Sequence, residues 1–154
     1  MRRRHSAGSG SGFTLLELLA VMAIAAVVMS LAVPASVRFF DSMQYRQAVR
    51  DMAATLSSAR YRAVTSGTTQ DVILQPFQGD VRYNGKVLSI SKDYPMEIKT
   101  AAALNRGSSG VVRFYPDGGS SGADITIAGP GDSATMISVD WLLGGVTLAP
   151  YALE

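Results

Sequence analysis

The sequence has 154 residues, which is enough for one domain with one hydrophobic core and too few for two. Apolar residues make up 47% of the chain and charged residues 17%, which excludes intrinsic disorder and fits a globular or membrane-anchored protein. The absence of cysteine excludes a disulfide framework, a zinc-thiolate site and a thiol nucleophile.

The formal net charge of +2 depends on the amino terminus. Arg2, Arg3 and Arg4 supply three of the fourteen basic residues, so the chain from Phe13 onward carries 11 basic and 12 acidic residues. The basic balance of the whole chain is therefore weak evidence for nucleic-acid binding.

Residues 1–12 are basic at first and then rich in glycine and serine, with nothing that would pack. Residues 13–33 follow with a single charged side chain, Glu17. As a helix this run would span ~30 Å, the thickness of a bilayer core. The preceding arginines predict that the amino terminus stays cytoplasmic and that the rest of the chain is translocated.

Three kinds of amino-terminal segment fit this pattern: a secretory signal cut after Ala35, an uncut signal anchor, and a precursor cut at Gly12. Glu17 favours the third, because an ionised carboxylate in a membrane usually has a partner. Cleavage before Phe13 would create an α-amine four residues from Glu17. The simpler alternative is a glutamate near the interface that reaches the lipid headgroups.

The stretch Gly12–Leu19, Gly-Phe-Thr-Leu-Leu-Glu-Leu-Leu, with the apolar run and Pro34 behind it, resembles the leader and helix of type IV pilins and type II secretion pseudopilins. The resemblance implies cleavage between Gly12 and Phe13 by a prepilin peptidase and N-methylation of Phe13. It also implies that Glu17 assists the docking of each subunit into a helical filament.

The helix is expected to continue past Pro34, which removes one backbone hydrogen bond and predicts a kink. Beyond it, apolar residues at alternating spacings of four and three form a stripe predicted to pack against a sheet: Tyr45, Val49, Met52, Leu56, Ala59 and Ala63. A surface for a partner helix is the alternative. Ser66-Gly67 is expected to end the helix. Residues 35–66 are therefore predicted to continue the anchor at 13–34, and the stripe makes this continuation amphipathic.

From residue 67 the pattern changes to that of short strands, expected at 71–75, 81–83, 86–90, 96–100, 111–115, 123–128, 135–140 and 146–148. Asn84-Gly85 predicts a two-residue hairpin between the second strand and the third. One long helix followed by antiparallel strands predicts an α+β fold. The expected architecture is a helical spine packed on an antiparallel β-sheet head domain at 67–154, which the resemblance implies is type IV pilin-like.

The carboxyl half carries a second resemblance. Val111–Gly122, with Ile125–Ile127 after it, is similar to the strand–turn–strand of the GspH/FimT family of minor pseudopilins. Ile137–Val139 and Gly144–Leu148 are similar to that family's closing hairpin. The middle of the domain, about Gly67–Asn105, carries no comparable motif.

Few residues are candidates for chemistry. The single histidine, His5, lies in the predicted leader, so Ser–His, Cys–His and histidine–metal chemistry are excluded downstream, and no catalytic residue is predicted. Asp117, Asp124 and Asp132 have oxygens suited to calcium but no recognisable ligand spacing, and Asp117 also suits a turn. We therefore expect no metal, no cofactor and no small-molecule substrate.

Nucleic-acid binding is weighed separately, because FimT-type proteins of some competent bacteria bind DNA through a basic carboxyl-terminal tail. Residues 149–154 of this chain contain no basic residue. The remaining arginines and lysines are scattered, which is more typical of a solvated surface than of a phosphate track. No nucleic-acid partner is expected.

Together the two resemblances imply a GspH-like minor pseudopilin of a type II secretion system, a structural subunit and not an enzyme. It would sit in the bacterial inner membrane with a single pass and a periplasmic head domain, and enter the pseudopilus on assembly. The implied partners are other pseudopilins, prepilin peptidase, the inner-membrane assembly platform and membrane lipid. Two alternatives stay open: a FimT/FimU-like minor pilin of a type IV pilus, involved in pilus assembly or DNA uptake, and a membrane-tethered periplasmic enzyme.

Overall fold

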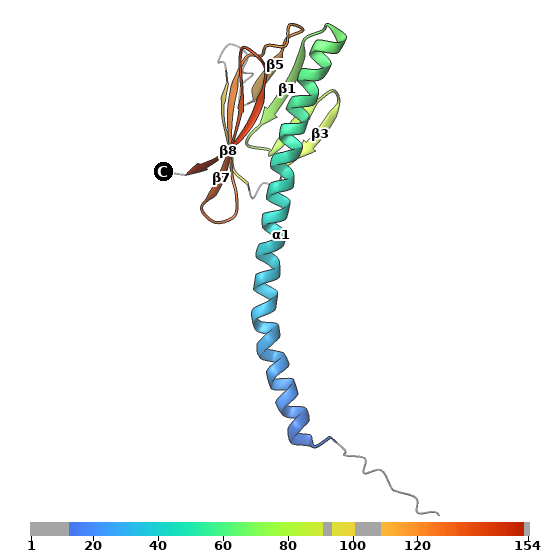
Figure 1. The fold of residues 1–154 in the computed structure, drawn as a ribbon, viewed down its shortest axis with the longest axis vertical. Helices are drawn as coiled ribbons and strands as arrows, with labels where there is room; N and C mark the ends of the chain where they lie inside the picture. Colours follow the sequence, from blue (N-terminus) through green and yellow to red (C-terminus); the bar gives the residue numbers. More distant parts are fainter. Residues whose placement is uncertain (1–12, 91–93, 101–108, 153–154) are drawn as a thin grey trace, which may run out of the picture. The chain divides into compact units, whose positions relative to one another are not determined.

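A computed structural model describes residues 13–90, 94–100 and 109–152 (Figure 1), without the side chains of 31–38 and 152. The predicted leader at 1–12, including Gly12, lies outside the described residues. The chain divides into two compact units, Met1–Arg38 and Phe39–Glu154. The second unit is called the head domain below.

One helix, α1, runs from Leu15 to Ser66 and so belongs to both units. Its first turn is capped by Thr14, whose Oγ1 accepts a hydrogen bond from the Glu17 backbone N–H at 3.2 Å. The backbone stays helical through Pro34. The predicted kink falls among residues whose side chains are not described, and it stays a prediction.

Eight strands lie in the described part of the head domain (Figure 1): β1 (Gln70–Gln75), β2 (Asp80–Tyr83), β3 (Lys86–Ser89), β4 (Met96–Thr100), β5 (Gly110–Phe114), β6 (Ala123–Ala128), β7 (Ser133–Val139) and β8 (Val146–Ala152). They form two antiparallel four-stranded sheets with the orders β3-β2-β1-β5 and β4-β6-β7-β8. The sequence predicted antiparallel strands but a single sheet. The chain alternates between the sheets: β4 already belongs to the second sheet, β5 returns to the first as a partner of β1, and β6 then pairs with β4 and β7.

The apolar stripe of α1 packs against strands of both sheets, as predicted. All six stripe residues are at least 94% buried, and Met52, Leu56, Ala59 and Ala63 are fully buried. They join one core with strand residues such as Phe114 and Ile125, which are also fully buried. Because burying one such large apolar side chain stabilises a fold by about 1.5–3 kcal/mol, this core holds the helix and both sheets together.

Tyrosines fix the start of the head domain. The Tyr45 hydroxyl donates to the Ile127 carbonyl at 2.9 Å and lies 2.8 Å from Thr135 Oγ1. Its ring meets that of Tyr94 edge-on at 5.4 Å, and the Tyr94 hydroxyl donates to the Asp41 carbonyl at 3.0 Å. These contacts satisfy buried polar groups while they attach α1 to the second sheet.

The predicted hairpin is present between β2 and β3. Asn84 and Gly85 have φ angles of 50° and 73°, the left-handed backbone that a two-residue turn of this kind requires. Farther along the first sheet, Arg113 donates two hydrogen bonds of 2.7 Å to the carboxylate of Asp71 on the adjacent strand. This hydrogen-bonded partner raises the pKa of Arg113.

Candidate assembly sites

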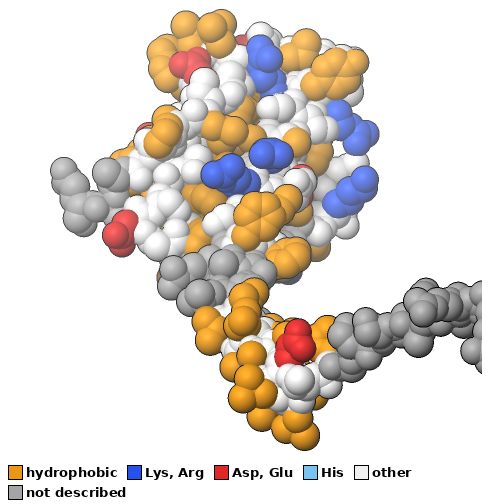
Figure 2. Space-filling view, turned by 60° about the horizontal axis from the view of Figure 1, so that its bottom comes forward, with side chains coloured by type: hydrophobic (Ala, Val, Ile, Leu, Met, Phe, Trp, Pro, Cys, Tyr) orange, Lys and Arg blue, Asp and Glu red, His pale blue; other side chains and the backbone are white. Residues whose placement is uncertain are grey.

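The apolar segment at 13–34, predicted to serve as anchor and assembly helix, has exposed side chains over most of its described length. Phe13, Leu15 and Leu16 are each 78% exposed, and the large apolar side chains onward to Met29 are at least half exposed. Figure 2 shows apolar side chains on the visible face of this segment with one acidic side chain among them. No helix in the described part of the chain is long and apolar enough to cross a membrane.

Glu17 is exposed on this segment, and within the described residues its carboxylate forms no hydrogen bond or ion pair. Only its backbone N–H is engaged, by Thr14. The Thr-x-x-Glu spacing is that of a capping box, a signal that is visible in the sequence. The structure therefore adds a helix-capping neighbour to the predicted docking charge.

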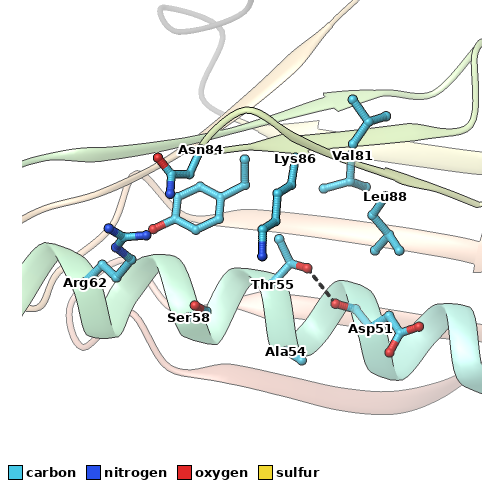
Figure 3. Close-up of a pocket in the computed structure, with 11 residues that line it drawn as sticks. Asp51, Ala54, Thr55, Ser58, Arg62, Val81, Asn84, Lys86 and Leu88 are labelled. Atoms are coloured by element: carbon cyan, nitrogen blue, oxygen red, sulfur yellow. Dashed lines mark hydrogen bonds between the residues drawn. The ribbon is translucent and has the colours of Figure 1, made fainter.

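A groove of about 460 Å³ lies in the head domain between α1 and the β2–β3 hairpin (Figure 3). Lys86 extends from the hairpin toward the helix, and Arg62 extends from the helix toward the hairpin. Asp51 supplies a carboxylate at the other end of the groove, where its Oδ1 accepts a hydrogen bond from Gln47. The groove therefore brings one carboxylate and two basic side chains to the same face of the head domain.

Of the three aspartates that could offer oxygens to calcium, Asp117 and Asp124 form local hydrogen bonds and Asp132 is exposed. Asp117 Oδ1 accepts the Gly119 backbone N–H at 3.0 Å, which is the predicted turn role. Asp124 Oδ1 accepts the Ser138 hydroxyl at 2.7 Å across β6 and β7. The described residues bring no three metal-ligating side chains together.

Known protein families match two separate parts of the chain. The prokaryotic N-terminal methylation motif matches residues 10–33, and the family described as "Type II transport protein GspH" matches residues 48–144. The chain belongs to the GspH family. It is 32% identical over 146 residues to type II secretion system protein H of Xanthomonas campestris pv. campestris, an alignment that covers 90% of this chain and 83% of that protein.

Two solved structures have the same fold as this GspH-family chain. The type IV minor pilin FimU of Pseudomonas aeruginosa PAO1 aligns with a TM-score of 0.53 at 16% identity, over 71% of this chain and 97% of that chain. The minor pseudopilin EpsH of the Vibrio cholerae type 2 secretion system aligns with a TM-score of 0.52 at 10% identity, over 70% and 95%. The predicted type IV pilin-like α+β fold is thereby confirmed.

Proposed function

We propose that this GspH-family chain is a minor pseudopilin of the type II secretion system, a structural subunit of the periplasmic pseudopilus that supports protein export across the outer membrane. One observation carries the proposal: a single chain holds the methylation motif at 10–33 and the GspH match at 48–144. The work of such a subunit is assembly with other pseudopilins, and no catalytic step is assigned to it.

The exposed apolar segment gives this proposal its physical basis. Residues such as Leu15, Leu18 and Met29 leave most of their apolar surface uncovered, and that surface costs roughly 25 cal/mol per Å² in water. In our proposal the inner membrane covers this segment first, in a single pass with the head domain in the periplasm. Packing against the corresponding helices of other pseudopilins replaces the lipid when the filament forms.

Cleavage of the leader takes place before the subunit leaves the membrane for the filament. Prepilin peptidase cuts between Gly12 and Phe13 and methylates the new terminus, and the inner-membrane platform then extracts the subunit. The new amine at Phe13 lies four residues from Glu17, a separation of about one helical turn. It can pair with the Glu17 carboxylate of the same chain or of a neighbouring subunit, which removes the cost of a lone charge in an apolar core.

Replacement of Glu17 tests the docking role. Glu17→Ala should leave cleavage at Gly12-Phe13 intact, as measured by the mass of the mature chain. Crosslinks to other pseudopilins should fall about tenfold or more, because the charge that pairs with the neighbour's amine is missing. Normal incorporation of Glu17→Ala would refute the docking role.

Thr14→Ala is the matched control for this experiment. It removes the cap at the start of α1, at a cost of about 1 kcal/mol, but keeps the Glu17 carboxylate. Incorporation of Thr14→Ala at near the wild-type level would separate docking from helix capping. An equal defect in both variants would mean that Glu17 acts by holding the first helical turn.

A further inference from the structure

The turn between β7 and β8 exposes three consecutive large apolar side chains. Trp141, Leu142 and Leu143 are 68%, 61% and 66% exposed. From Phe39 onward, the described residues include no other run of three such side chains. Contiguous exposed apolar residues of this kind are typical of interaction sites, where tryptophan is enriched among the residues that contribute most to binding. We call residues 140–145 the Trp141 turn.

The backbone of the Trp141 turn is held by its own hydrogen bonds. Asp140 Oδ1 accepts the N–H groups of Leu142 and Leu143 at 2.9 and 2.7 Å. The Gly144 N–H donates to the Asp140 carbonyl, and the Asp140 N–H donates to the Gly145 carbonyl, both at 2.9 Å. A turn fixed in this way presents its side chains with little loss of backbone entropy on binding.

A neighbouring loop fixes the turn from a second side. The Ser120 N–H donates to the Trp141 carbonyl at 2.9 Å, and the Ser120 hydroxyl donates to the Asp140 carbonyl at 2.8 Å. Ser120 is itself 94% buried. The backbone carbonyls of the turn therefore point into the domain while the three apolar side chains face solvent.

The Trp141 turn lies at the end of the head domain where α1 ends. Arg60 Nε donates to the Gly118 carbonyl at 3.4 Å, and a Cβ added to Gly144 would lie 2.5 Å from that same carbonyl oxygen. The chain enters the head domain at Phe39, at the other end of this helical segment, about 30 Å away at 1.5 Å per residue. The turn is thus remote from the point where the amino-terminal helix joins the head domain.

Charges around the turn favour a protein partner over a membrane. Asp140 within the turn and Asp117 near it supply two carboxylates, and Arg60 supplies one guanidinium. Attraction to an anionic lipid surface needs an excess of lysine and arginine, which the described residues around the turn do not supply. An apolar cavity with basic residues at its rim complements the turn better.

We propose that the Trp141 turn docks into an apolar, basic-rimmed cavity on the head domain of another pseudopilin. This inference rests on the proposed function, because assembly with other pseudopilins brings their head domains near this one. Trp141 and Leu142 insert as anchors, and the hydrogen-bonded backbone sets their positions.

Photocrosslinking in cells tests the contact directly. A photoreactive amino acid is placed at position 141 of the full chain, and at Phe77 as a matched control. Phe77 is 85% exposed on the β1–β2 turn, away from the Trp141 turn. We expect position 141 to capture a protein that carries a prepilin motif and position 77 to capture none. Capture of lipid alone, equal capture at both positions, or no capture at position 141 would overturn the proposal.

Substitutions give a second, independent readout. Trp141→Ala combined with Leu142→Ala should lower co-purification with the captured pseudopilin about tenfold or more, whereas Phe77→Ala and the conservative Trp141→Phe should stay near wild type. Unchanged co-purification of the double variant would contradict the inference. A deletion strain separates the two claims: normal export without the gene refutes the proposed function, while lost export with no capture at position 141 refutes only this inference.

Discussion

Leu56 shows how strongly the head domain depends on single residues of α1. Its side chain is fully buried in the core between the helix and the two sheets. Leu56→Ala removes three carbon atoms and leaves a cavity, so we expect the free energy of unfolding to fall by about 2–5 kcal/mol. Urea unfolding of the full chain in detergent, followed by circular dichroism, measures this change.

Tyr61 provides the control on the same helix, because its side chain is 70% exposed. Tyr61→Ala should change the free energy of unfolding by no more than about 0.5 kcal/mol. Similar losses for the two variants would mean that the stripe of α1 is not what joins the helix to the sheets.

Burial of single side chains was predictable from the sequence at some positions and not at others. The buried stripe was predictable because helical spacing places its members on one face. Exposure of Trp141, Leu142 and Leu143 was not, since a short apolar run gives no sign of whether its side chains face the core or solvent. Thr14 carried a readable capping signal, which the docking interpretation of Glu17 overlooked.

At the scale of elements, strand positions followed from the sequence far better than strand partners. Met96–Thr100 and Ala123–Ala128 have the predicted bounds. β1, β2 and β3 differ from prediction by one residue at one end, and β5 and β7 differ by one or two residues at both ends. Alternation shows which face of a strand is buried but not which strand lies beside it, so the division into two sheets was missed. β8 extends four residues past its predicted end and includes Pro150, which is tolerated because β8 is an edge strand.

The β7–β8 turn supplies a prediction at this scale. Gly144 has a φ of 60°, and a Cβ there would lie 2.5 Å from the Gly118 carbonyl oxygen. Gly144→Ala therefore combines a left-handed backbone with a steric clash, and we expect it to lower the free energy of unfolding by about 2 kcal/mol or more. Urea unfolding of the full chain in detergent checks this value.

Gly145 is the matched control, because no atom lies within 4 Å of a Cβ added there. Gly145→Ala should unfold at nearly the wild-type urea concentration. If the two alanine variants proved equally stable, the close approach of the β7–β8 turn to the Gly118 carbonyl would be wrong.

At the scale of the whole molecule, the two family matches fall in different compact units. The methylation motif at 10–33 lies in the first unit, and the GspH match at 48–144 lies in the head domain. The predicted GspH family and minor pseudopilin function are confirmed by these matches and by the related protein H of Xanthomonas campestris. Similarity to both FimU and EpsH shows the shared fold and does not itself separate secretion from piliation.

Loss of this subunit should stop type II secretion and leave pili intact. Export of type II substrates into the medium is compared between the parent strain, a strain that lacks this gene, and the deletion strain complemented with the wild-type chain. Surface pili are counted in the same cultures. We expect the deletion strain to lose export and keep its pili, and we expect the complemented strain to recover full export. Normal export together with lost pili in the deletion strain would contradict this expectation and identify a minor pilin instead.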